Sequence, residues 1–231
     1  MTIRYKDILL WGHSLKAYKK MFSLTDDELK LSILDCCGGP ASFNAELTDQ
    51  GGHVISTDPL FSLNETQIAE RIEEVFAQML AIVREHKDRF LWEDERSVDK
   101  LAQIRHSNIE LFLKDFAKGL EEGRYFPDSP PDLHFQHYQF DLALCSHYLF
   151  ANSPEQTVEY HAAAIENLCD VAKEVRVFPL LDSMGEIPDI VGPVTKALHD
   201  KDLGVEIKAV PYQFQKKGNA MLRVWAQKCE V

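Results

Sequence analysis

The sequence of 231 residues lacks several features that mark specialised classes of protein. It has no apolar run near the roughly 18 residues that a membrane-spanning helix needs, and its first apolar stretch is too short for a signal peptide. It also has no internal repeat and no low-complexity tract. We therefore expect a cytoplasmic globular protein without a membrane partner.

Basic residues are few: 25 Lys and Arg stand against 37 Asp and Glu, which gives a net charge of −12. Binding a phosphate backbone needs a basic stripe, so this balance argues against a nucleic-acid partner. The five cysteines are odd in number and have no CxxC spacing, which favours reduced thiols over disulfides or a metal site. The length and the 45% hydrophobic content suit one domain over residues 1–231.

What the sequence does contain is an alternation of short apolar runs and longer amphipathic stretches. Short runs bounded by Gly, Pro or Asp predict strands, and apolar positions spaced by three and four predict helices. We expect strands at 31–37, 53–57, 140–146, 175–180, 205–214 and 220–227, and helices at 41–50, 65–86, 98–120 and from Ser153 onward. This order predicts an α/β fold, a doubly wound, mostly parallel, Rossmann-like sheet that ends in an antiparallel hairpin.

Two stretches lie outside that core. Residues 1–30 precede the first strand, and we expect them to form a helical cover. Residues 59–123 are too long for one crossover, so they predict a crossover helix plus a helical insertion, which is either a lid or the surface of a homodimer. Asn64 and Gln67 have the spacing of a capping box, and Arg105 interrupts the second apolar stripe of this region.

The turn after the first strand is the main candidate for a ligand site. Ligands of open α/β sheets bind at the carboxyl ends of strands, and Asp35 stands at such an end, just before Gly38 and Gly39. These glycines allow close approach of the backbone to a ligand, and the start of the next helix favours an anionic group. Asp58 ends the next strand, where dinucleotide folds place a carboxylate on the ribose hydroxyls. The alternative is that both carboxylates only cap turns.

At these positions the sequence resembles the class I S-adenosylmethionine (SAM)-dependent methyltransferases. Their first motif has an acidic residue followed by three alternating glycines; Asp35 and Gly39 match it, whereas Cys37 and Ala41 replace the outer glycines. Residues 133–147 resemble the family's fourth strand, and the closing hairpin resembles its sixth and seventh strands, which implies a seven-stranded sheet. The resemblance covers residues 31–58 and 124–227, and is greatest for a bacterial methyltransferase-like subgroup.

The resemblance implies SAM as cofactor and assigns roles to single positions. Asp35 would organise the turn, and Asp58 would hold the ribose hydroxyls. Many members have an Asp after the third strand that binds the adenine amino group. Counting back from the fourth strand places Ser129 at this position, with Asp128 next to it in the sequence. The implied cofactor-binding residues are Asp35, Cys37, Gly38, Gly39, Pro40, Asp58, Pro59, Leu60, Asp128, Ser129, Cys145 and Ser146.

Methyl transfer mainly needs alignment of the acceptor and exclusion of water, and a base is needed only for some acceptors. His147 is the first candidate base, although it could instead anchor a loop, and His13 is the second. We favour Trp11 and Tyr18 as walls of the pocket over a role in core packing. No Asn-Pro-Pro-Tyr motif follows the fourth strand. The acceptor is therefore not identified, and the acidic chain with its covered pocket favours a small molecule.

Two other functions compete with methyl transfer. A non-catalytic SAM- or nucleotide-binding module would use the helical insertion to bind a partner, and would bind the cofactor without turnover. An NAD-dependent oxidoreductase also needs a glycine-rich turn and an acidic ribose ligand. The replaced outer glycines and the closing hairpin argue against the oxidoreductase.

Overall fold

The computed structural model describes residues 11–92, 96–151 and 157–226. These residues build a seven-stranded sheet in the order β3-β2-β1-β4-β5-β7-β6. All pairs of neighbouring strands are parallel except those of β7, which runs antiparallel to β5 and β6. The strands are β1 (Ser32–Cys36), β2 (His53–Thr57), β3 (Tyr125–Phe126), β4 (Phe140–Ser146), β5 (Ala172–Phe178), β6 (Leu203–Ala209) and β7 (Ala220–Ala226). The predicted fold class is confirmed, and this strand order is the class I methyltransferase topology.

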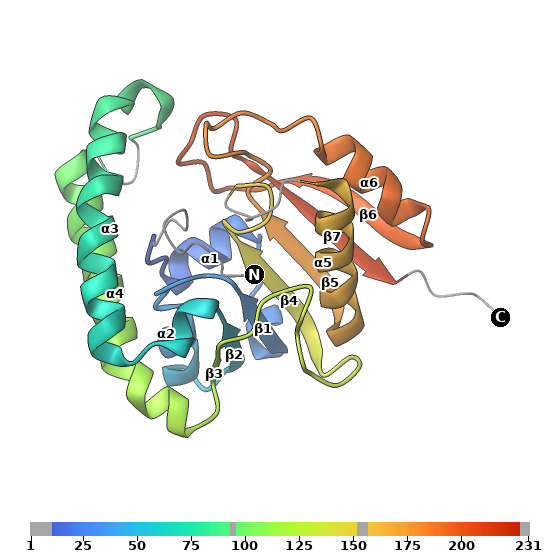
Figure 1. The fold of residues 1–231 in the computed structure, drawn as a ribbon, viewed down its shortest axis with the longest axis horizontal. Helices are drawn as coiled ribbons and strands as arrows, with labels where there is room; N and C mark the ends of the chain where they lie inside the picture. The colour runs from blue at the N-terminus through green and yellow to red at the C-terminus, as the bar shows by residue number, and fades with distance from the viewer. Residues whose placement is uncertain (1–10, 93–95, 152–156, 227–231) are drawn as a thin grey trace.

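Helices cover both faces of the sheet, and a further helical layer lies at its β3 side (Figure 1). The long helices α3 and α4 lie side by side in that layer, on the opposite side of the molecule from α6. Among the described residues, no helix is long and apolar enough to cross a bilayer. The helices are α1 (Leu15–Met21), α2 (Phe43–Asp49), α3 (Glu65–Glu85), α4 (Val98–Glu121), α5 (Val158–Val171) and α6 (Val191–His199), with short 3₁₀ turns η2 (Glu28–Lys30), η3 (Pro59–Ser62) and η4 (Lys87–Arg89).

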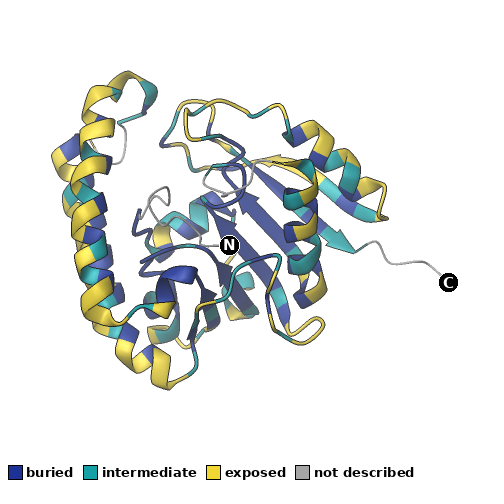
Figure 2. Ribbon diagram, in the orientation of Figure 1, coloured by how far each residue is buried: buried dark blue, intermediate teal, exposed yellow. Residues whose placement is uncertain are grey.

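The interior follows from the alternation of side chains along the strands. Leu34 and Ala143 pack with the residues of α5 and α6, whereas Ile33 and Leu142 pack with those of α1 and α2. A separate apolar cluster joins α3, α4 and β3. In Figure 2 the central strands are almost wholly buried, while α3 and α4 are exposed along much of their length. The insertion is thus an amphipathic layer with its own core.

The start of α3 confirms a local prediction. The side chain of Asn64 accepts a hydrogen bond from the amide of Gln67, and the side chain of Gln67 accepts one from the amide of Asn64. This reciprocal pair is the predicted capping box. At α5, the predicted cap at Ser153 lies outside the described residues, and the structure caps this helix with Thr157.

The prediction of one strand over residues 205–214 is wrong in its second half. β6 ends at Ala209, and the following segment leaves the sheet. The ring of Phe214 lies 4.8 Å from that of Phe90 and 6.1 Å from that of Trp11, centroid to centroid. Phe214 is therefore buried against the helical layer, whereas Val210 packs with the residues of α1 and α2.

Candidate functional site

The backbone of the turn after β1 has an unusual conformation. Cys37 has a φ of 54° and Gly39 a φ of 63°, so both lie in the left-handed region. That region favours glycine, which gives a physical reason for a glycine motif at these two positions. The amide of Cys37 donates a hydrogen bond to the carbonyl oxygen of Thr57 at 2.6 Å, and this fixes the turn to the end of β2.

Asp35 lies beneath this turn and is buried. The hydroxyl of Tyr18 donates to Asp35 Oδ1 at 2.7 Å, and the hydroxyl of Ser56 donates to Oδ2 at 2.9 Å. Burial raises the pKa of Asp35 to about 7, although the two hydrogen bonds act in the opposite direction. Tyr18 is fully buried and stacks on Phe43, so it supports Asp35 from the core and is not among the residues that line the cavity described below.

Asp58 connects the turn to the segment after β2. Its Oδ2 accepts from the amide of Gly39 at 2.9 Å, and its Oδ1 accepts from the amide of Leu60 at 2.8 Å. Burial raises the pKa of Asp58 to about 6, against these two backbone hydrogen bonds. The capping role given above as the alternative is therefore present. A carboxylate has about four acceptor positions, of which these bonds use two.

The residues expected around an adenine lie at the same edge of the sheet. β3 pairs with the end of β2, with Phe126 opposite Thr57. Asp128 follows two residues later, and its carboxylate lies 3.3 Å from His134 Nδ1. The carbonyl oxygen of Ser129 accepts from the amide of Asp132. Pro59 and Leu60 are buried in η3, directly after Asp58.

The end of β4 brings the remaining predicted residues together. Cys145 lies opposite Cys36 in the register of β1 and β4, as expected if these strands are neighbours. Ser146 Oγ lies 2.9 Å from His147 Nδ1, and His147 has a left-handed φ of 55°. The described part of the chain has no group of three or more His, Cys, Asp or Glu side chains that could hold a metal ion.

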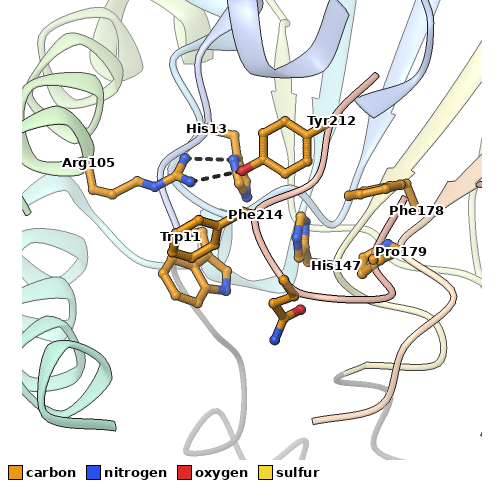
Figure 3. A pocket seen from close by; sticks show the side chains of 10 residues that line it. Trp11, His13, Arg105, His147, Phe178, Pro179, Tyr212 and Phe214 are labelled. Atoms are coloured by element: carbon orange, nitrogen blue, oxygen red, sulfur yellow. Dashed lines mark hydrogen bonds between the residues drawn. The ribbon is translucent and has the colours of Figure 1, made fainter. Parts of the chain in front are cut away.

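A cavity of about 310 Å³, including its opening to solvent, adjoins the ends of β4 and β5 (Figure 3). Four separate parts of the chain form its walls: the segment before α1, helix α4, the ends of β4 and β5, and the loop between β6 and β7. Trp11 lines this cavity, whereas Tyr18, which was also predicted as a wall, is packed in the core, and both predicted catalytic histidines line the same cavity. The residues that line the cavity include Trp11, His13, Arg105, His147, Tyr212 and Phe214.

The two histidines stack on each other at the centre of this cavity. Their ring centroids are 4.6 Å apart, with 20° between the planes. Nη1 of Arg105 donates to His13 Nδ1 at 2.7 Å, and Nη2 donates to the hydroxyl of Tyr212 at 3.2 Å (Figure 3). A guanidinium group can only donate. His13 Nδ1 therefore accepts, and the proton of the neutral ring is on Nε2.

Both imidazoles are neutral at pH 7. Burial, with the positive charge of Arg105 as a second cause, lowers the pKa of His147 to about 3. Burial, then the charges of Arg105 and His147, lower the pKa of His13 well below its usual value. General base catalysis is most efficient when the pKa is near the working pH, so the free protein holds His147 as a weak base.

Of the six cavity residues named above, sequence reasoning missed three as parts of a site. Arg105 had a signal, because it is a charged residue within an apolar helical stripe. Tyr212 and Phe214 had none, because their segment resembled a strand. Their positions depend on the contact between the loop that joins β6 to β7 and the helical insertion.

Comparisons with known proteins add the following. No protein-family model matches the chain. A protein of the archaeon Methanocaldococcus jannaschii, named only as uncharacterised, is 28% identical over 225 residues, which cover 95% of this chain and 97% of the relative. An archaeal relative does not confirm the predicted bacterial subgroup.

Several solved structures share the general fold. WbdD in complex with a kinase inhibitor is 11% identical with a TM-score of 0.48, and the match covers 92% of this chain but only 40% of that structure. A SAM-dependent methyltransferase from Aquifex aeolicus is 13% identical with a TM-score of 0.44, over 94% of this chain and 90% of the other. A 1,6-didemethyltoxoflavin-N1-methyltransferase from Burkholderia thailandensis, with bound S-adenosylhomocysteine, is 14% identical with a TM-score of 0.44, over 92% and 79%. At this level of similarity they carry no information on function.

Proposed function

We propose that the protein is a SAM-dependent methyltransferase that acts on a small-molecule acceptor. The observation that carries this proposal is the turn after β1, which is left-handed at Cys37 and Gly39 and is tied to Asp58 at the end of β2. The turn belongs to a sheet with the class I methyltransferase strand order. Strand order and turn geometry are independent features, and both suit an adenosyl ligand at this edge.

The chain's own residues would hold such a ligand as follows. The two unused acceptor positions of Asp58 would take the ribose hydroxyls, and Pro59 and Leu60 would pack near the adenine. The backbone from Cys37 to Gly39 would line the methionine part, above the buried carboxylate of Asp35. Bound SAM supplies a methyl group that its sulfonium has already activated, so the protein has to align an acceptor and exclude water.

The cavity beside β4 is the place we propose for the acceptor. It adjoins Ser146 and His147, and aromatic rings form much of its wall. Because the pKa of His147 is about 3, we assign this residue to positioning the acceptor through hydrogen bonds, in place of the predicted role as general base.

Calorimetric titration of S-adenosylhomocysteine and NADH tests the cofactor. We expect S-adenosylhomocysteine to bind the wild type, and Asp58→Asn to weaken it by at least about tenfold, the size of one lost charge-assisted hydrogen bond. Asp141→Asn is the matched control. Asp141 also accepts a backbone hydrogen bond, from Ser32 at 3.1 Å, but it stands at the opposite end of the sheet.

Thermal melting of both variants must show that each is folded before the affinities are compared. Binding of NADH in place of the adenosyl compound, or binding of neither, would rule the proposal out. Equally strong binding of S-adenosylhomocysteine to Asp58→Asn would support the proposed cofactor and contradict the ribose contact assigned to Asp58. Production of S-adenosylhomocysteine from SAM with candidate acceptors then separates an enzyme from a module that only binds.

A further inference from the structure

Arg105 is a buried cation that has no counter-ion among the described residues. Its side chain extends from α4 into the cavity, the residue is 3% exposed, and no carboxylate of the described residues forms an ion pair with it. Its two hydrogen bonds go to neutral groups, His13 and the hydroxyl of Tyr212. An unpaired charge in a protein interior is unfavourable by several kcal/mol.

The other buried arginines of the described chain provide an internal comparison. Arg124 pairs with Asp115 at 2.7 Å, and Arg176 pairs with Glu174 at 2.7 Å and also with Glu28. Their charges are therefore compensated within the fold. Arg105 differs from both of them, and it lines the cavity beside the ends of β4 and β5.

Two donor groups in the same cluster also lack a partner. Arg105 Nε and His13 Nε2 are buried and make no hydrogen bond with any described residue. Because His13 Nδ1 accepts from Arg105, the Nε2 of the neutral ring carries the proton and is a donor. His13 is 2% exposed, so solvent does not satisfy it. A cation and unpartnered N–H groups around one cavity call for a ligand with acceptor atoms and negative charge.

Charge and shape narrow the class of ligand. Burial lowers the pKa of both histidines, so the cluster carries a single positive charge, that of Arg105. A phosphate monoester carries about −1.5 to −2 at pH 7, which exceeds this charge, whereas a carboxylate matches it. The rings of Trp11 and Phe214 pack against each other in the wall and suit a planar apolar body.

We propose that this cavity is a carboxylate-binding site, in which Arg105 and His13 Nε2 bind the carboxylate of a small ligand and the aromatic wall contacts its body. The guanidinium fork matches the geometry of a carboxylate. The inference rests on the cavity and does not depend on methyl transfer. The carboxylate has two sources, a separate ligand, which the aromatic wall favours, or the methionine part of an adenosyl cofactor.

The first experiment is calorimetric titration of benzoate and of its neutral isostere benzamide. We expect saturable binding of benzoate to the wild type, with benzamide at least about tenfold weaker. Arg105→Gln removes the charge and keeps an N–H donor, and should weaken benzoate by at least about tenfold. Lys114→Gln is the matched control, because Lys114 is exposed on the same helix and the change removes the same charge.

The second experiment distinguishes the two sources. S-Adenosylhomocysteine has the methionine-derived carboxylate, and 5′-methylthioadenosine lacks it. If Arg105→Gln weakens the first compound and not the second, and benzoate does not bind, the carboxylate site stands and its ligand is the cofactor. If benzoate binds through Arg105 and no adenosyl compound binds, the site stands and the proposed function fails.

The inference is overturned if Arg105→Gln changes the affinity for neither benzoate nor S-adenosylhomocysteine. Equal binding of benzoate and benzamide to the wild type, with no effect of Arg105→Gln on S-adenosylhomocysteine, also overturns it. If Arg105→Gln does not fold, two comparisons within the wild type decide. A preference of the protein for benzoate over benzamide, or for S-adenosylhomocysteine over 5′-methylthioadenosine, supports the site, and the absence of both preferences removes it.

Discussion

Two buried polar clusters lie at the carboxyl edge of the sheet, and they differ in how well their polar groups are satisfied. In the turn cluster, which consists of Asp35, Asp58 and their donors, each of the four carboxylate oxygens accepts a hydrogen bond. In the cavity cluster of His13, Arg105 and His147, two buried N–H groups have no hydrogen-bond partner and a cation has no counter-ion within the described parts of the chain.

This difference separates a cluster whose groups are each hydrogen-bonded within the fold from a cluster whose charge and donors are left for a ligand. Satisfied polar networks fix one local structure, and the turn cluster fixes the two left-handed positions after β1. Features that are locally unfavourable are expected at functional sites. Removing a member of the turn cluster should therefore disturb the fold, whereas removing Arg105 should not.

The largest effect should come from Asp35→Asn and should depend on pH. Burial raises the pKa of Asp35 to about 7 in the folded protein, from 3.8. Between these values the folded state keeps a proton that the unfolded state has lost, so the stability of the wild type falls as pH rises. Asparagine does not titrate. Relative to the variant, the wild type should lose about 4 kcal/mol between pH 4 and pH 8, since one pKa unit is about 1.4 kcal/mol.

Urea unfolding of both proteins across this pH range measures the difference. Asp141→Asn is the control, because the hydrogen bond from Lys173 lowers the pKa of Asp141, and its titration should not produce this loss. A constant difference between wild type and Asp35→Asn would mean that Asp35 has the same pKa in the folded and unfolded states, and that its environment is more polar than the buried contacts imply.

The next effect concerns the space beneath the turn. A Cβ at Gly38 would lie 2.3 Å from the Tyr18 hydroxyl oxygen and 2.8 Å from Asp35 Oδ1. Tyr18 is fully buried and cannot move aside easily. Gly38→Ala should therefore destabilise the protein by about 2–3 kcal/mol through overpacking. Gly192→Ala in α6 meets no atom within 4 Å and should be neutral or stabilise by up to about 1 kcal/mol. Denaturant midpoints compare the two, and equal midpoints would contradict the tight packing of the turn.

Much of the fold was predictable because its signals are local. β1, β2 and β4 are short apolar runs with turn residues at their ends, and the cap of α3 is a two-residue signature. The missed elements lack such signals. β3 has two residues, which is too short for any period, and α6 has Gly192 and Pro193 in its first turn. Pro211 was an available argument against a strand through residues 210–214.

The site divides in the same way. Apart from Tyr18, the turn cluster lies within residues 35–60, so its motif could be recognised from the sequence. The cavity cluster brings together His13, Arg105 and His147, which are far apart in the chain, and Tyr212 lines the same cavity. Sequence alone indicated the two histidines as reactive types and Arg105 as an interruption. It could not show that they meet, because this depends on how the insertion packs on the sheet.

Arg105→Met tests whether the charge in the cavity cluster destabilises the fold. Removal of this buried charge should raise the free energy of unfolding by about 1 kcal/mol. The reason is that the variant no longer has to bury a charge, and this gain exceeds the loss of two hydrogen bonds to neutral groups. Lys114→Met on the exposed face of α4 should change it by less than about 0.5 kcal/mol. Urea unfolding without added carboxylate tests this. A loss of several kcal/mol in Arg105→Met would show that Arg105 stabilises the fold and would place it with the turn cluster.

The smallest effect is a change in the pKa of His147 without a change of structure. The charge of Arg105 is the second cause, after burial, that lowers the pKa of His147 to about 3. NMR titration of the His147 ring should therefore give a higher pKa in Arg105→Gln than in the wild type, and an unchanged one in Lys114→Gln. Saturating benzoate should shift the wild type in the same direction, because a bound carboxylate neutralises Arg105. If the variant raises this pKa and benzoate does not, the guanidinium acts on His147 and the proposed ligand does not reach it. A pKa that is insensitive to both would mean that burial alone sets it, and the two residues would then be neighbours without electrostatic coupling.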